Sequence, residues 1–156
     1  MAQARAQIKA FSAAFRLATA TALIGWIAIL GFPLWPRQAA SVTLTLSVTL
    51  LCAVYCYLVF AGHRHDEPDT KIRGNFFSLA GVLSVFKSPR VVLAGWVHFL
   101  AFDLTIGLYI VGDAARHGIS HWLVLPVLLL TMMLGPAGLL LYLLVRLAMT
   151  GNGLLT

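Results

Sequence analysis

Long apolar segments separated by short polar connections dominate the chain. Four of them have about the 20 residues that an α-helix needs to cross a bilayer, at about residues 17–35, 42–61, 91–112 and 122–145. Few charged side chains interrupt these segments, which is typical of helices surrounded by lipid and by other helices. The pattern predicts an all-α integral membrane protein, a four-transmembrane-helix bundle, with residues 1–156 as a single membrane domain.

A shorter apolar segment, residues 74–86, lies between the second and third predicted spans. At about twelve residues it is too short to cross the bilayer. Ser78, Gly81 and Ser84 fall along a narrow face of small residues, and bulkier apolar side chains lie elsewhere. We expect a short amphipathic helix on the membrane surface, or a re-entrant helix, between spans two and three.

The fourth span is interrupted by Gly135, Pro136 and Gly138. A proline removes one backbone hydrogen bond and bends a helix at membrane depth. The predicted kink either serves helix packing or opens a cavity beside the third span, and the sequence leaves both interpretations open.

The composition excludes a soluble enzyme, because 60% of the residues are hydrophobic and 10% are charged, against about 25% charged in soluble domains. The basic residues are unevenly divided. Arg37 and Arg116 lie in the two connections assigned to one side, and nine lie on the other side: Arg5, Lys9, Arg16, Arg64, Lys71, Arg73, Lys87, Arg90 and Arg146. The positive-inside rule then predicts both termini in the cytoplasm. The net charge of +6 reflects the orientation of the chain in the membrane and not nucleic-acid binding. The short basic N-terminus before a retained first span favours a bacterial inner membrane.

Ionisable side chains inside a span are the main functional candidates. Asp103 lies near the middle of the third span, where a charge costs at least about 2.5 to 3.5 kcal/mol. His98 precedes it by five positions and Asp113 follows it by ten. At about 100° per residue, all three fall within one arc of about 140°. We therefore expect His98, Asp103 and Asp113 to line one internal pocket.

A neutral carboxylic acid and a neutral imidazole can act as proton donor and acceptor without a cofactor, and removal from water favours both neutral forms. Asp103 with His98 is such a pair. The alternative is that both side chains only form hydrogen bonds between helices, as membrane bundles commonly do. Threonines of spans two and four are the expected partners in that case: Thr43, Thr45, Thr49 and Thr131.

Asp113, His117 and His121 have the spacing of metal ligands on one helix face. Gly118 weakens this interpretation, because a glycine at the membrane surface favours the end of a helix. Haem would need ligands at membrane depth, where His98 is the one histidine within a span. We expect no metal and no cofactor, with a metal at the three-residue set kept as the alternative.

Several residues occur in the order of a known membrane family. Trp96, His98, Asp103, Leu104 and Asp113 match the pattern W-[IV]-H-x4-D-L-x8-D, with further similarity at residues 79–88 and 136–138. In these residues the chain resembles the abscisic-acid-deficient-4-like family over roughly residues 75–146. The first two spans match in hydropathy alone.

Plant members of that family are needed to make neoxanthin from violaxanthin. The resemblance implies a membrane protein that acts on a lipid-soluble isoprenoid of the carotenoid type, by isomerisation of an epoxide to an allene and a tertiary alcohol. His98, Asp103 and Asp113 would be catalytic, and Trp96, Phe102, Thr105 and Pro136 would contact the substrate. The alternative is a non-catalytic subunit that binds pigment or lipid, or a scaffold for another enzyme. Homo-oligomers and a partner enzyme remain open.

Overall fold

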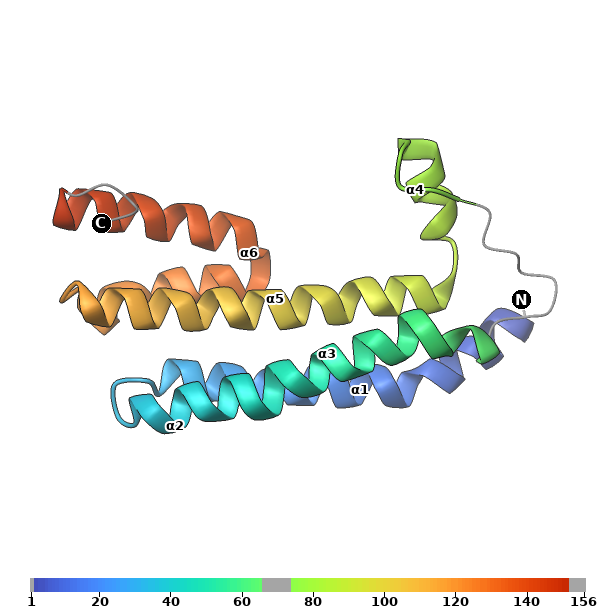
Figure 1. Cartoon of the computed structure of the whole chain (residues 1–156), viewed down its shortest axis with the longest axis horizontal. Coiled ribbons are helices and arrows are strands. Elements are labelled where there is room, and N and C mark those ends of the chain that lie inside the picture. Colours follow the sequence, from blue (N-terminus) through green and yellow to red (C-terminus); the bar gives the residue numbers. More distant parts are fainter. Residues whose placement is uncertain (1, 66–73, 152–156) are drawn as a thin grey trace.

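The structure, a computed structural model, describes residues 2–65 and 74–151 and is helical throughout most of these ranges. Figure 1 shows long helices running side by side, with one short helix standing apart. In chain order the elements are α1 (Ala2–Leu30), α2 (Pro36–Ser41), the π-helical η1 (Val42–Val48), α3 (Thr49–Cys56), the π-helical η2 (Tyr57–Ala61), the 3-10 turn η3 (Gly62–His65), α4 (Leu79–Val85), α5 (Pro89–Arg116) and α6 (His121–Thr150).

Four of the described helices are long and apolar enough to cross a membrane, which confirms the predicted fold class. They cover Phe11–Leu30, Pro36–Ala61, Pro89–Arg116 and His121–Thr150. The second and third begin earlier than the apolar runs predict, because Pro36 and Pro89 each occupy the first turn of a helix. Proline suits that position, since its fixed φ is already helical and no N–H is needed there.

α5 lies centrally, with α1 and the rod from α2 to η2 on one side and α6 on the other (Figure 1). Small residues allow the close approach. A Cβ added to Gly25 would lie 2.9 Å from Leu104, and one added to Gly107 would lie 2.9 Å from the Trp26 ring. In the apolar bilayer, such close packing of helix surfaces is a main source of helix association.

α6 does not continue straight past its Gly and Pro residues. Leu134 has φ −142° and ψ 62°, which is not helical, and at this point the chain turns back on itself (Figure 1). Gly138 then packs against Thr131, so closely that any side chain at position 138 would overlap the Thr131 backbone. Pro136 lies in the first turn of the second half, where its missing N–H is tolerated.

Contacts with α5 show the direction of the returning half. Asp103 lies against Gly135, Asp113 bonds Tyr142, and His117 contacts Arg146. Residue numbers rise together along both helices, so the second half of α6 runs parallel to α5. A straight α6 would be antiparallel to α5 along its whole length. The predicted kink is therefore present, but it is a reversal of direction.

The reversal changes where the C-terminal end of α6 lies. In Figure 1 this end is beside the end of α5, at the opposite end of the bundle from the start of α1. This arrangement differs from the expectation that both termini share one side, because the second half of α6 runs back toward the end of α5. Arg146, assigned above to the basic side, lies instead against Asp113 at the end of α5. Lys71 and Arg73 lie outside the described residues.

α4 is the short apolar helix expected between spans two and three. It stands across the long axis of the bundle, near the start of α5 (Figure 1). Ser78 caps it by accepting a hydrogen bond from the Gly81 N–H at 3.1 Å. The side chains of Phe76, Phe77 and Leu79 are largely exposed. A short helix with apolar side chains directed away from the protein, lying across the spans, is suited to the surface of a membrane.

Candidate functional site

The three ionisable residues of the third span do not share one pocket. His98 and Asp113 are fifteen positions apart on the uninterrupted helix α5, a rise of about 22 Å at 1.5 Å per residue. The structure gives each of the three a different environment. His98 lines a cavity, Asp103 lies at the bend of α6, and Asp113 belongs to a buried polar cluster.

His98 lies in a largely apolar cavity of about 580 Å³ between α3, η2, α4 and α5. This volume is within the roughly 300 to 1,000 Å³ of small-molecule sites. The lining residues are Tyr55, Val59, Gly74, Phe76, Val85, Phe86, Arg90, Val91, Ala94, Gly95, His98 and Phe99. The cavity therefore offers aromatic and aliphatic walls with few polar groups, a composition suited to a lipid-soluble molecule.

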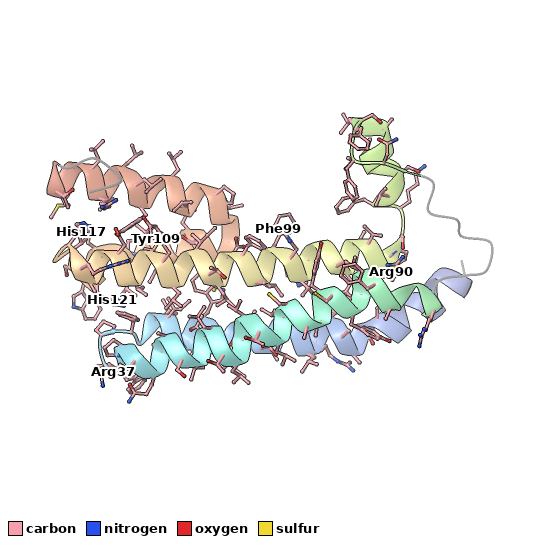
Figure 2. All side chains as sticks on the ribbon, in the orientation of Figure 1. Arg37, Arg90, Phe99, Tyr109, His117 and His121 are labelled. Atoms are coloured by element: carbon pink, nitrogen blue, oxygen red, sulfur yellow. The ribbon has the colours of Figure 1, made fainter. Side chains whose placement is uncertain are left out.

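Aromatic rings hold the His98 imidazole in place. Its ring centroid lies 4.4 Å from that of Phe102 and 5.7 Å from that of Tyr55. Arg90 lies near the start of α5 and Phe99 further along the same helix (Figure 2). The buried Arg90 side chain donates a hydrogen bond to the Leu58 carbonyl at 2.8 Å. The cavity thus has a guanidinium group toward one end and an imidazole about 12 Å along the helix axis.

Asp103 is half-buried at the point where α6 reverses. One of its carboxyl oxygens lies directly over Gly135, so no side chain larger than hydrogen fits at position 135 without displacing the carboxyl group. His98 precedes Asp103 by five positions on the same helix, about 7.5 Å along the axis at 1.5 Å per residue. Asp103 is therefore placed to contact the bend of α6.

Asp113 is buried in a polar cluster that joins α5 to the returning half of α6. Its Oδ2 accepts a hydrogen bond from the Tyr142 hydroxyl at 2.5 Å and lies 3.1 Å from Arg146 Nε. His117 Nδ1 lies 2.8 Å from the Asp113 carbonyl oxygen, and its Nε2 lies 3.1 Å from Arg146 Nη2. These partners favour the neutral tautomer in which Nδ1 donates to the carbonyl and Nε2 accepts from the guanidinium.

The cluster has the properties of a structural connection. Asp113, Tyr142 and Arg146 are 6%, 0% and 3% exposed, and Figure 2 shows His117 and Tyr109 between α5 and the returning half of α6. A carboxylate and a guanidinium group that are buried together compensate each other's charge, and either one alone would be an uncompensated buried charge. The cluster therefore fixes the end of α6 against α5, away from the His98 cavity.

The metal alternative is not supported by this geometry. His121 points away from Asp113 and His117, with its Nε2 3.0 Å from the Leu30 carbonyl oxygen of α1. The cation beside Asp113 and His117 is the Arg146 guanidinium. Within residues 2–65 and 74–151, no three His, Cys, Asp or Glu side chains are grouped as metal ligands.

The four residues expected to contact substrate have separate positions. Phe102 packs on the His98 ring but is not among the lining residues of the cavity. Trp96 faces α1, with Nε1 3.5 Å from Thr19 Oγ1, and Thr105 donates to the Ala101 carbonyl of its own helix at 2.8 Å. Pro136 is exposed just after the bend in α6.

Sequence reasoning missed four residues that the structure brings to these sites. Arg90 and Tyr55 line the cavity, while Tyr142 and Arg146 hold Asp113. In the charge pattern, Arg90 and Arg146 count as topology signals alone. A buried position for either was not evident, although an arginine within an apolar run is itself a sign of a buried partner.

The fold and the cavity define a helical membrane protein with a largely apolar binding site. The chain belongs to the ABA DEFICIENT 4-like family, whose sequence model matches residues 13–142. The match includes α1 from residue 13 onward and the rod from α2 to η2, so the relationship extends beyond the hydropathy that these segments show. No curated protein and no solved structure matches the chain significantly. Membership identifies a membrane protein of a carotenoid-related family.

Proposed function

We propose that this protein binds a lipid-soluble isoprenoid of the carotenoid type in the His98 cavity and isomerises it by acid–base chemistry, without a cofactor. The observation that carries the proposal is an imidazole on the wall of an apolar cavity of about 580 Å³, with the half-buried Asp103 carboxyl group five positions further along α5. Polar groups that converge on an otherwise apolar cavity are typical of ligand sites. Family membership favours a carotenoid as the isoprenoid.

The proposed reaction converts an epoxide beside a polyene into an allene and a tertiary alcohol. The C–O bond of the epoxide breaks, and its electron pair remains on the oxygen, which takes a proton from the neutral Asp103 carboxyl group. A proton leaves carbon to neutral His98, and the C–H electron pair forms the new double bond of the allene. No electrons are gained or lost overall, and a proton returned from His98 to Asp103 restores both groups.

Access to the cavity is proposed to come from the bilayer. The side chains of His98 and Phe99 are exposed on α5, so the other described helices leave part of each side chain uncovered. A carotenoid dissolved in the bilayer can therefore reach the imidazole without leaving the apolar phase. Apolar walls also exclude water, which would otherwise add to a reactive cationic intermediate.

We further propose that the protein lies in a bacterial inner membrane with its N-terminus in the cytoplasm. Support comes from the end of the bundle that holds the start of α1 and the start of α5, where Arg16, Lys87 and Arg90 lie. Basic residues favour the cytoplasmic side. Membrane lipid and the isoprenoid are the proposed partners, with a homo-oligomer or a partner enzyme as further possibilities.

The test is expression of the protein in carotenoid-producing cells that supply epoxy-carotenoids, followed by chromatography of the extracted pigments. Wild type should yield an isomer of unchanged mass. His98→Gln should lower conversion by about a hundredfold or more, the usual contribution of a general base. Unchanged conversion by His98→Gln would contradict the assignment.

Binding to the cavity has its own control. Gly95 lines the cavity, so Gly95→Leu should fill part of it and reduce the pigment that copurifies with the protein. A Cβ at Gly112, also on α5, would meet no atom within 4 Å, so Gly112→Leu should leave pigment binding unchanged. Equal pigment loss in both variants would argue against the cavity as the binding site.

A second candidate function is a non-catalytic pigment- or lipid-binding subunit, or a scaffold for another enzyme. The contact of Asp103 with Gly135 favours it, because the carboxyl group there can serve packing of α6 alone. This function predicts copurified pigment, visible in the absorption spectrum, without conversion. His98→Gln would then change binding but leave the pigment composition of the cells as it is.

A further inference from the structure

A second cavity, of about 570 Å³, lies between the first half of α1 and the start of α5. Phe11 and Phe15 of α1 and Val92 and Trp96 of α5 are among its lining residues. Trp96 and His98 are two positions apart on α5, about 200° around the helix, so the two cavities lie on opposite faces of α5. Nothing in the proposed acid–base chemistry uses this second cavity.

The polar side chains of the cavity lie toward one end, and the lining further along α5 is apolar and aromatic. Lys87, just before α5, and Ser12, near the start of the first span, are polar lining residues. Trp96 lies seven residues beyond Pro89, about 10 Å further along the axis, and its ring stacks on Phe15 with centroids 6.0 Å apart. The polarity therefore changes with depth as it does along a phospholipid, from headgroup to acyl chain.

The charge at the polar end is positive. The Lys87 side chain is exposed, and no carboxylate within residues 2–65 and 74–151 forms an ion pair with it. Asp103 and Asp113, the two carboxylates in those ranges, lie against α6 instead. An ammonium group at the level where the spans begin attracts the anionic headgroups of the cytoplasmic leaflet.

We propose that this second cavity binds an anionic glycerophospholipid, with its phosphate at Lys87 and an acyl chain along Phe15, Val92 and Trp96. Charge complementarity selects this occupant. A second protein chain would have to bring its own carboxylate to Lys87, and a hydrocarbon would leave the ammonium group without an anion. A phospholipid supplies one anionic group and an apolar chain in the order that the cavity presents them.

Native mass spectrometry of the purified full chain in neutral detergent tests the proposal. Phosphatidylglycerol and phosphatidylcholine with the same acyl chains are titrated separately. Phosphatidylglycerol should bind more tightly, and Lys87→Gln should weaken its binding about fivefold, the factor given by about 1 kcal/mol per basic residue. Lys87→Arg should retain binding. Arg37→Gln, which removes an exposed cation at the other end of the bundle, should leave binding unchanged.

A second variant tests the apolar part of the cavity without altering charge. Val92 is half exposed and lines the cavity, so Val92→Trp should fill it and lower phosphatidylglycerol binding, while Lys87 remains. Equal binding of the two lipids, or wild-type binding by Lys87→Gln and Val92→Trp, would overturn the proposal. So would a dimer that forms through this face and is not displaced by phosphatidylglycerol.

Discussion

The hydroxyl group of Tyr142 should contribute substantially to the free energy of unfolding. Tyr142 is fully buried, and its hydroxyl donates to Asp113 Oδ2 at 2.5 Å. Tyr142→Phe keeps the ring and removes this donor from a buried carboxylate. Hydrogen bonds to charged groups contribute about 1.5 to 3 kcal/mol, whereas interhelical hydrogen bonds in membrane proteins average about 0.6 kcal/mol.

The range for hydrogen bonds to charged groups applies here, because the acceptor is a carboxylate buried by protein. We expect Tyr142→Phe to lower the free energy of unfolding by about 1.5 to 2 kcal/mol, toward the lower end of the charged range, because Arg146 still contacts Asp113. Arg146→Met should cost more, about 3 to 5 kcal/mol, since it leaves a buried carboxylate without its cation. Reversible unfolding in mixed detergent micelles measures both values.

Tyr109 provides the matched control. Its ring contacts that of Tyr142 edge to face, with centroids 6.2 Å apart, but it is 42% exposed. Tyr109→Phe should change stability by less than about 0.5 kcal/mol. Equal losses for Tyr109→Phe and Tyr142→Phe would refute the claim that the Asp113 cluster holds the returning half of α6.

Further predictions concern the bend and the topology. Gly138→Ala should destabilise the protein by about 1 to 3 kcal/mol, because the new methyl group overlaps Thr131. Gly112→Ala, the control, should stabilise the protein by up to about 1 kcal/mol. A Gly138→Ala variant as stable as wild type in unfolding experiments would argue against a tight reversal. A cysteine at position 116 should be labelled from outside intact cells, and one at position 71 only after permeabilisation; the opposite pattern would reverse the proposed orientation. Thr150→Cys should be labelled like position 116, because α6 turns back toward the end of α5; labelling like position 71 would contradict the reversal.

Much of the fold follows from the sequence because the bilayer imposes a length on apolar helices. Continuous apolar runs predicted the four long helices, and the twelve-residue run predicted the short helix α4. The reversal at Leu134 is different. Gly135 and Pro136 specify where the helix breaks, but the direction after the break depends on contacts with α5, such as that of Arg146 with Asp113. Such contacts are not encoded in the segment that bends.

The candidate site was predictable only in part, because it too depends on contacts between helices. Residue spacing placed His98, Asp103 and Asp113 on one side of α5. The angular position of a residue does not show which neighbouring helix it faces at its depth along α5. A rise of about 22 Å between His98 and Asp113 separates an open cavity from a buried cluster. The spacing of Asp113, His117 and His121 resembled a metal site, yet His121 turns to α1 and bonds the Leu30 carbonyl.

The central claim is acid–base catalysis by His98 and Asp103, and Asp103→Asn tests it most directly. Asparagine keeps the shape of the side chain and its contact with Gly135 but cannot donate a proton as a carboxylic acid does. Pigment conversion is measured by chromatography in cells that contain equal amounts of folded wild type and variant. The account predicts that Asp103→Asn still copurifies with pigment and loses conversion, whereas conversion at the wild-type level would contradict it.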